Sequence, residues 1–468
     1  MRNYLVIPLL LGCSASVEAL TLEQSVAQAM MNNPQLIQKY ARFEAKYRDK
    51  RAAFSDYLPQ VSLYAATGYE RVTHDNGRDI DSDLNRRELG LRVTQSLFSG
   101  FSTVDEVARL DFEVKADQQV LISAAENLSL EIAQTYIDLF KSQGVYELSV
   151  QNVDDHKDIL KNIQSRADKG LSSTADVAQV QSRLATAQSS LIAAKNNQFD
   201  LKAQYFDLVG EYPNDLHMPR ADATYLPASL DIAIERAKEN HPEIKASILD
   251  VKAAGKQIDR EQGDFWPKID LQLDVNSNDN VGGYEGPDDD GRLMLTMSYD
   301  LYSGGKSVAR TEASAWRKEE AKAIRDSTYR QVIEGTTLAW NAHKFVGEQK
   351  GFYRQNVNFA SQAQKGYMQQ FVIGRRSLLD VLDSKIELFL ARKNYLRASF
   401  DQHKASYRLI NATGRLIEEL RVDTPDAWKL KDQEDAEESG TDIESTDVES
   451  TDVESTNNES DNAQEVEK

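Results

Sequence analysis

Two aspartates, Asp380 and Asp383, stand three residues apart in the segment GRRSLLDVLDS, with leucine and valine around them. The segment has the pattern of a helix start, and residues three apart share one face of a helix. Two like charges are therefore held side by side, and the only opposite charges within this segment are Arg375 and Arg376. This pair is the main candidate for a functional site.

Other chemistry finds little support in the sequence. The six histidines are scattered, without metal-ligand spacing, at positions 74, 156, 217, 241, 343 and 403. GGKS at Gly304 to Ser307 hints at a phosphate loop, but Asp300 stands where that motif requires glycine. No catalytic residue, metal or cofactor is expected, and a net charge of −20 disfavours binding to nucleic acid.

The first nineteen residues have the layout of a secretory signal peptide, with Arg2, an apolar run and small residues before a cut after Ala19. The alternative is a lipoprotein signal in which Cys13, the single cysteine, carries the lipid. No later stretch reaches the roughly 18 apolar residues of a membrane-spanning helix.

The other end is acidic. Residues 431–468 contain six Asp and nine Glu against two Lys, with the iteration IESTDVESTDVEST. Low hydrophobicity with high charge predicts a disordered, solvated tail, the alternative being binding of calcium or a partner.

An internal repeat organises the chain between these ends. Asn33-Pro34 recurs as His241-Pro242, displaced by 208, and Gly170 recurs as Gly374, displaced by 204. A displacement that changes only once indicates two homologous halves. We expect a first repeat at residues 20–213, a linker at 214–229, a second repeat at 230–416 and a C-terminal segment at 417–468.

Each half reads as a helix that runs to a proline, two strands, and two very long helices. The first helices are expected from Leu22 to about Tyr57 and from Ile232 to about Phe265. The strands alternate with period two over about ten residues, the length of a tilted membrane-crossing strand, and two ordinary hairpins packed on the helices are the alternative. They are expected at about 60–72, 87–98, 268–276 and 292–302. The long helices are expected at about 102–169, 173–209, 305–373 and 377–412, with apolar residues in the 3-4 spacing of a coiled coil.

Four membrane-length strands cannot close a barrel, and an open sheet edge in lipid leaves backbone groups unpaired. The smallest bacterial barrels have about eight strands. The chain is therefore expected to pool its strands with those of other copies and to line up its helices around the same axis.

The residues now resemble a known family. The segment LTLEQSVAQAMMNNPQL, its echo SLDIAIERAKENHPEI, the two Ser-Gly turns and GRRSLLDVLDS resemble the TolC family of outer-membrane efflux and secretion channels, over residues 20 to 416. Within it, RSLLDVLDSKIELFLARKNYLRA is most similar to outer-membrane components of type I secretion for large adhesins (the agglutination-protein type).

This resemblance implies a mainly α protein with membrane β-strands, a homotrimer whose twelve-stranded barrel is continued by a periplasmic helical barrel. It implies location in the outer membrane, a periplasmic adaptor, an inner-membrane ABC transporter and an exported protein substrate. An outer-membrane channel for a drug or metal efflux pump of the RND type is the alternative, and a soluble periplasmic coiled-coil adaptor is a more remote one.

The resemblance also gives roles to the tip residues. Asp380 and Asp383 match paired aspartates in the closed periplasmic entrance, where carboxylates crowded around one axis raise each other's pKa and attract cations. The alternative for Asp380 is a capping box with Ser377. Arg376 and Asp176 match a latch between neighbouring coiled coils, although Ala175 and Phe371 replace a threonine and a tyrosine of the family pattern.

Overall fold

The computed structural model describes residues 21–73, 81–214 and 216–430. The expected signal peptide at residues 1–19, with Cys13, and the acidic tail at 431–468 lie outside the described residues. The chain divides into two units, Met1–Thr424 and Pro425–Lys468. The described part of the second unit holds one short 3-10 helix, η3 (Asp426–Trp428).

The first unit contains the same series of elements twice. The first series is α1 (Leu22–Asn32), α2 (Pro34–Phe54), η1 (Ser55–Tyr57), β1 (Gln60–Thr73), β2 (Asp81–Phe98), α3 (Ser102–Asp168) and α4 (Thr174–Val209). The second is α5 (Leu230–Asn240), α6 (Pro242–Gln262), η2 (Gly263–Phe265), β3 (Lys268–Asp279), β4 (Pro287–Ser298), α7 (Lys306–Val372) and α8 (Leu378–Ala412), followed by α9 (Leu416–Glu419). The two longest helices, α3 and α7, both have 67 residues.

The expectation of one helix before each first strand is wrong, because each is broken at its internal proline. Asn33 leaves the helical conformation, its side chain accepts a hydrogen bond from the Gln35 N–H at 2.9 Å, and Pro34 starts α2. His241 caps α6 in the same way, ahead of Pro242. A proline has no N–H to donate into the preceding turn, so it favours the first position of a new helix.

The strand ends also differ from the expected ones. β2 begins earlier, at Asp81, because its first residues pair with the end of β1. β4 begins at Pro287 and ends at Ser298, not at 302, because Ser298 pairs with Lys268, the first residue of β3. The residue before Lys268 is Pro267, which has no N–H for a further ladder bond.

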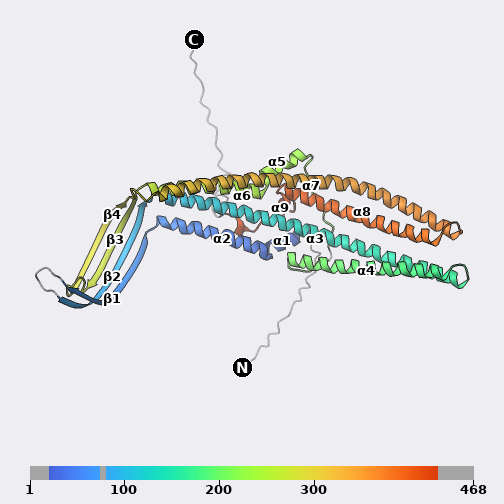
Figure 1. Ribbon diagram of the computed structural model, residues 1–468, viewed down its shortest axis with the longest axis horizontal. Helices are drawn as coiled ribbons and strands as arrows, with labels where there is room; N and C mark the ends of the chain where they lie inside the picture. The colour runs from blue at the N-terminus through green and yellow to red at the C-terminus, as the bar shows by residue number, and fades with distance from the viewer. Residues whose placement is uncertain (1–20, 74–80, 215, 431–468) are drawn as a thin grey trace, which may run out of the picture. The chain divides into compact units, whose positions relative to one another are not determined.

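The four strands form one antiparallel sheet in the order β1-β2-β3-β4, so that β2 and β3 join the two halves (Figure 1). The register places large apolar residues opposite one another across the sheet: Val61 and Val93, Val93 and Leu273, Leu273 and Leu293. Because side chains alternate between faces, the residues between these form a second, polar face. The sheet therefore has one apolar and one polar face.

On the polar face, Tyr64 lies across Gly90. The Tyr64 hydroxyl donates to Asn276 Oδ1 at 2.7 Å, two strands away. A Cβ on Gly90 would lie 2.2 Å from the Tyr64 ring, so only glycine leaves room for it. The aromatic ring covers the strand glycine and links three strands.

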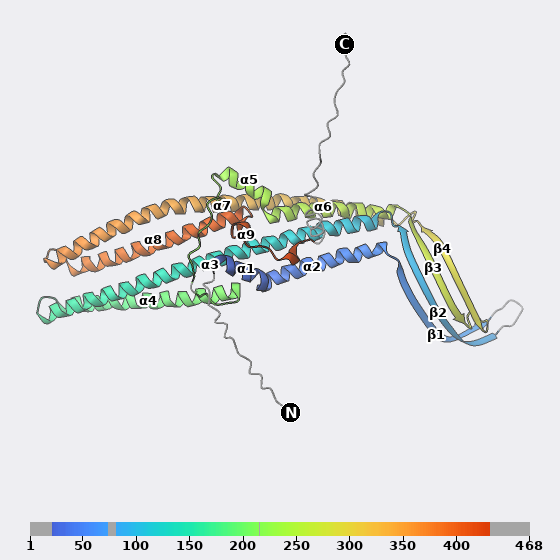
Figure 2. The same cartoon turned by 180° about the vertical axis from the view of Figure 1, so that it is seen from behind.

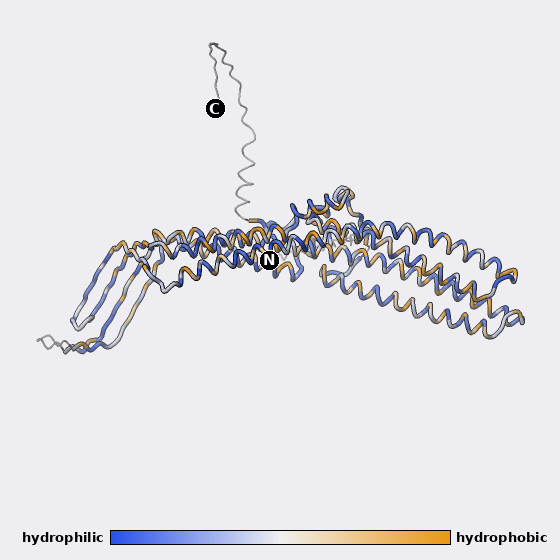
Figure 3. Tube along the Cα trace, turned by 45° about the horizontal axis from the view of Figure 1, so that its top comes forward, coloured by the Kyte–Doolittle hydropathy of each residue, from blue (hydrophilic) through white to orange (hydrophobic). Residues whose placement is uncertain are grey.

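The long helices form two hairpins, α3 with α4 and α7 with α8, whose turns lie at the end of the unit away from the sheet (Figures 1 and 2). Contacts between α3 and α8 join the hairpins, so the lateral order is α4, α3, α8, α7. The hydropathy colours in Figure 3 change at short intervals along these helices. The expected seams are buried at positions such as Val180 and Ala187 on α4 and Val381 and Leu388 on α8. No helix in the described part is long and apolar enough to cross a membrane.

A buried glutamate holds the chain where α8 gives way to α9. The Glu126 carboxylate, on α3, accepts the backbone N–H groups of Leu416 at 3.0 Å and Ile417 at 3.1 Å. Asn411 also donates to it, at 3.4 Å. Burial raises the pKa of Glu126 to about 7, and these hydrogen bonds oppose the increase.

Candidate functional site

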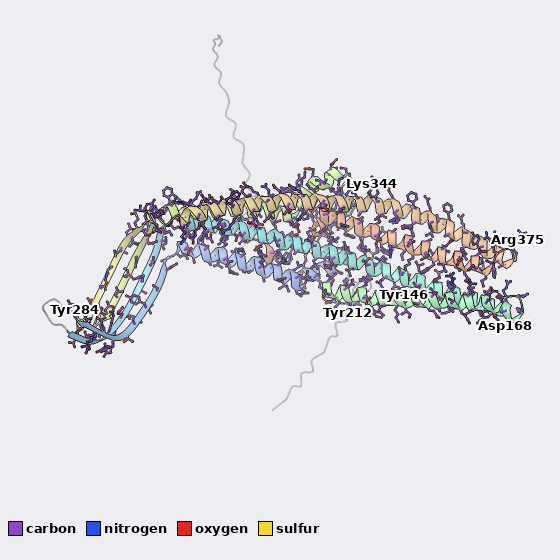
Figure 4. The ribbon with its side chains drawn as sticks, in the orientation of Figure 1. Tyr146, Asp168, Tyr212, Tyr284, Lys344 and Arg375 are labelled. Carbon is purple, nitrogen blue, oxygen red and sulfur yellow. The ribbon has the colours of Figure 1, made fainter. Side chains whose placement is uncertain are left out.

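The candidate site lies at the turn ends of the two hairpins, where the sequence places its paired aspartates. Figure 4 labels Asp168, at the end of α3, and Arg375, after the end of α7, on the two hairpin tips at this end of the unit. Each turn passes through a glycine with positive φ, Gly170 at 73° and Gly374 at 75°. Glycine adopts this conformation without strain, which allows the helix to end and the chain to reverse.

Both second helices of the hairpins start with the same cap. Ser173 and Asp176 exchange hydrogen bonds at the start of α4, and Ser377 and Asp380 do so at the start of α8. Such reciprocal bonds satisfy N–H groups that the first helical turn leaves free. The two starts therefore lie at equivalent places, as the internal repeat requires.

An apolar cluster fixes one hairpin against the other just behind the turns. Its buried members are Ile159, Ile163, Val180, Leu378 and Leu382. Leu382 is fully buried, whereas Leu379, one residue before Asp380, is 45% exposed. The leucines of LLDVLD thus divide between a packed face and an exposed face of α8, and this orients the aspartates away from the cluster.

Asp380 is occupied by its own helix start. Its Oδ2 accepts from the Ser377 hydroxyl at 2.9 Å and from the Ser377 N–H at 3.2 Å, and Arg376 Nη1 lies 3.8 Å away. The hydrogen bonds from Ser377, and then the charge of Arg376, lower the pKa of Asp380. The increase in pKa expected from crowding concerns several copies, and within one chain the direction is opposite.

Asp383 has a partner that sequence reasoning missed. Arg183, on α4, donates from Nη2 to Asp383 Oδ1 at 3.0 Å, and both side chains are partly exposed. The view that only Arg375 and Arg376 stand near the aspartates was therefore wrong. No local signal could have found this partner, because Arg183 lies 200 residues before Asp383.

The two residues of the expected latch each contact their own hairpin. Arg376 lies over the Tyr367 ring, 4.3 Å from its centroid, and donates to Gln370 at 3.0 Å. Asp176 accepts from Ser172 and Ser173, which lower its pKa. In the described parts of this single chain the two are not joined by an ion pair, and a latch between copies stays a prediction.

Two further contacts cross between the hairpins. The Arg166 guanidinium lies 5.0 Å from the centroid of the Phe371 ring, which stands where the family pattern has tyrosine. Lys385 Nζ lies 2.9 Å from Asp155 Oδ2. A cation over an aromatic ring is attracted without any hydroxyl. Phe371 therefore keeps a polar contact with α3 in place of a hydrogen bond.

This arrangement places charged groups at the surface of the tip. The tip presents solvent-accessible carboxylates with arginines within reach, and among the described residues no group of three or more His, Cys, Asp or Glu side chains is placed to hold a metal ion. Exposed ion pairs are individually weak, so they exchange partners at small cost.

The comparisons with known proteins agree with this architecture. A family model described as "Outer membrane efflux protein" matches residues 26–210 and 233–415, one match for each half of the chain. The chain belongs to the outer membrane efflux protein family. The two matched segments follow the two structural repeats.

Individual members of the family are similar over most of their length. "Outer membrane efflux protein BepC" of Brucella suis biovar 1 (strain 1330) is 27% identical over 398 residues, covering 85% of this chain and 86% of that protein. "Outer membrane protein TolC" of Vibrio cholerae serotype O1 is 25% identical over 432 residues, covering 89% and 96%. "Solvent efflux pump outer membrane protein SrpC" of Pseudomonas putida is 25% identical over 387 residues, covering 80% of each.

Solved structures show the same fold. The Campylobacter jejuni CmeC outer membrane channel superposes with a TM-score of 0.75 at 15% identity, covering 89% of each chain. A CusC structure superposes with a TM-score of 0.75 at 13% identity, covering 84% of this chain and 92% of that one. The fold of this family member is therefore TolC-like, as the resemblance implied.

Proposed function

We propose that three copies of this chain form an export channel in the outer membrane, continued through the periplasm by the long helices. One observation carries the proposal. In the part of the chain that the structure describes, the edge strands β1 and β4 each have one unpaired side, and the outer helices α4 and α7 each have an exposed apolar face. A closed ring of copies would provide partners for both.

The outer helices carry the clearest sign. Exposed apolar residues recur every seven positions on α7, at Leu338, Phe345, Phe352 and Phe359, and on α4, at Ile192, Phe199 and Phe206. A seven-residue apolar repeat is the pattern of a helix that packs against another helix. Because α4 and α7 flank the set of four helices, α4 of one copy would pack on α7 of the next.

The sheet also indicates contact with neighbouring copies. β1 and β4 are its edges, and its apolar face is exposed at Leu63, Leu293 and Leu295. In lipid an unpaired edge is not tolerated, whereas an apolar outer face is required. Three sheets joined edge to edge would give twelve strands with the polar faces inside.

The tip would then form the entrance of the channel from the periplasm. Three copies would gather Asp380 and Asp383 near one axis, with Arg183 and Arg376 competing for them. Opening would exchange pairs within a copy for pairs between copies, with Asp176 of a neighbour as the proposed partner of Arg376. A periplasmic adaptor and an inner-membrane transporter would drive this exchange.

Two kinds of cargo have support. The similarity of residues 376–398 to outer-membrane components for adhesins favours type I secretion with an ABC transporter. The similarity to SrpC, a solvent efflux pump outer membrane protein, equally favours small-molecule efflux with an RND pump. Deleting the gene in its host distinguishes them, because loss of one large surface protein supports the first and drug or solvent sensitivity supports the second.

The channel itself is tested with purified protein. We expect the protein to remain with the outer membrane after carbonate washing and to give discrete conductance steps in planar lipid bilayers. A monomer that stays soluble without detergent and gives no steps would refute the proposal.

The gate is tested by Arg183→Ala and Arg376→Ala, with exposed Arg354→Ala on α7 as the control. Each tip variant frees one carboxylate from its partner, so we expect higher open probability and stronger block by divalent cations than in the wild type or the control. Unchanged single-channel behaviour in both tip variants would rule out the gate and the latch.

A further inference from the structure

A charged cavity of about 450 Å³ lies where α6, β3 and α7 meet, far along the chain from the tip aspartates. Its charged lining consists of Arg260, Glu261, Asp264, Lys268, Arg310 and Arg317. Four cations therefore face two carboxylates in one cavity.

Close backbone packing occurs at residues next to the cavity lining. Gly100, with φ 66°, and Gly263 approach so closely that a Cβ on Gly100 would lie 2.3 Å from the Gly263 carbonyl oxygen. A Cβ on Gly263 would in turn lie 2.0 Å from Ser102 Oγ. Because η2 begins at Gly263 and contains Asp264, this contact limits where Asp264 and the nearby Lys268 can lie.

The cations are only partly neutralised. Asp264 is shared between Lys268 at 3.9 Å and Arg310 at 4.0 Å, both at the limit of an ion pair. Arg260 pairs with Glu106 and Glu261. Arg317 has no ion pair within the ranges that the structure describes. Positive charge is therefore in excess on the α7 side of the cavity.

The two repeats show that this excess is particular to the second half. With the displacement of 204, Arg310 and Arg317 stand where the first half has Glu106 and Glu113. In the first half Arg109 lies between those glutamates and bonds to both, whereas its equivalent in the second half is Ala313. The same helix face is internally paired in α3, whereas in α7 its positive charge is only partly paired, through Asp264.

Arg260 and Lys268 also differ from their equivalents in the first half. With the displacement of 208 that holds before the strands, Arg260 and Lys268 stand where the first half has Ala52 and Gln60. All four cavity cations thus replace neutral or acidic residues of the first half, while Asp264 keeps its equivalent, Asp56. A general need for solubility or helix stability would apply to both halves.

The face of the cavity follows from the strand register, and this step rests on the proposed function. Lys268 alternates with Ile269 and so shares the polar face of the sheet with Asp270 and Gln272. If the polar face lines a channel, Lys268 and the cavity beside it open to the solution inside. Rings of Arg and Lys in a pore select or bind anions.

We propose that this cavity binds an oxyanion, a phosphate or carboxylate group, from the solution inside the channel. Arg310 and Arg317 provide the planar donor groups that suit two oxygens of one anion, and Lys268 adds a point charge. In an assembly of three copies the sites form a basic belt through which anionic groups of the cargo pass.

Binding is measured first, by isothermal titration of the detergent-purified full-length protein with inorganic phosphate. The double variant Arg310→Glu with Arg317→Glu introduces the residues found at the equivalent positions of the first half. It should weaken phosphate binding at least about tenfold, the effect of losing one charge-assisted hydrogen bond. The neutral variant Arg317→Gln should weaken it less. Arg330→Glu with Arg354→Glu, which makes the same charge change at exposed positions of α7, should leave binding unchanged.

Conduction is measured second. The reversal potential is recorded in a KCl gradient that is free of phosphate, and again after phosphate is added. The wild type and the control should be less cation-selective than the double variant. Phosphate should reduce the current through the wild type and the control and leave the current through the double variant unchanged. Phosphate binding without conductance would leave the cavity assignment in place and refute the channel. Conductance with no phosphate binding, or with equal selectivity in all variants, would overturn the oxyanion site and leave the channel in place.

A third arm distinguishes a dissolved ion from a lipid headgroup. The titration is repeated with a short-chain phosphatidylglycerol, first alone and then in competition with inorganic phosphate. Binding of inorganic phosphate that the lipid does not displace supports a site open to the channel. Binding of the lipid alone would place the cavity against the bilayer and overturn the proposal.

Discussion

At the scale of single residues, Glu126 couples the stability of the first unit to pH. Its carboxylate is buried, and burial raises its pKa from 4.5 to about 7. A carboxyl group whose pKa is higher in the folded chain binds its proton more tightly there. Its contribution to stability is therefore complete below pH 4.5 and is lost as the pH rises to about 7.

We expect this loss to amount to about 3 kcal/mol between those pH values. Glu126→Gln should lower the thermal midpoint at pH 5, because one backbone N–H loses its acceptor, but should flatten the fall towards pH 8. Circular dichroism melting in detergent measures both effects. Glu131→Gln, at an exposed position on the same helix, is the control. An equal pH slope in wild type and Glu126→Gln would contradict the assignment.

At the scale of elements, the two hairpins are held together at their turn ends by a small apolar cluster. Leu382 is fully buried in it, between residues of α3 and α4. Coiled-coil seams within each hairpin continue along its length, whereas this cluster provides the buried apolar contact between the hairpins near the tip. A loss here should loosen the tip before it unfolds the helices.

Leu382→Ala should destabilise the tip by about 2–5 kcal/mol, the usual cost of such a cavity. Amide hydrogen exchange around Ile159 and Ile163 should accelerate by at least about tenfold, while exchange in the sheet stays unchanged. Leu379→Ala removes the same atoms from an exposed position and should change little. Equal exchange in the two variants would show that the cluster does not join the hairpins.

At the scale of the whole molecule, assembly depends on the exposed apolar stripes of α4 and α7. Phe345→Asp with Phe352→Asp places charges where a neighbouring α4 is expected to pack. We expect this variant to remain monomeric while the wild type is trimeric, because buried unpaired charges are costly. Light scattering coupled to gel filtration in detergent measures the mass.

The control for this variant is Asn358→Asp with Lys365→Gln, which makes the same change in net charge on the same helix at exposed positions outside the stripe. The control should still form trimers. A trimeric Phe345→Asp, Phe352→Asp variant would show that the subunits meet elsewhere.

Much of the fold could be predicted because its signals are local and occur twice. Positive-φ glycines at Gly170 and Gly374, the serine caps at Ser173 and Ser377 and the 3-4 seams each follow from a few neighbouring residues. The repeat then fixed the displacement between the halves. The helix breaks at Asn33 and His241 also had a local signal, the proline that follows each. Because the apolar periodicity continues on both sides of each proline, one continuous helix was expected instead.

The candidate site was only half predictable. Asp380 and its cap lie within four residues of chain, so the sequence determined their contact. The partner of Asp383 is Arg183, two hundred residues earlier, and their meeting depends on how α4 and α8 are packed through α3. Spacing along one helix says nothing of this distance.

The sequence by itself determined the period of each element and the equivalence of the halves, because caps, glycine turns and apolar spacing act over a few residues. The tertiary structure decided which charges are paired. Arg317 faces a cavity and Arg109 bonds to two glutamates, although both stand on the same face of equivalent helices. Charge pairing is a property of separate segments brought within a few ångströms, and only packing sets those distances.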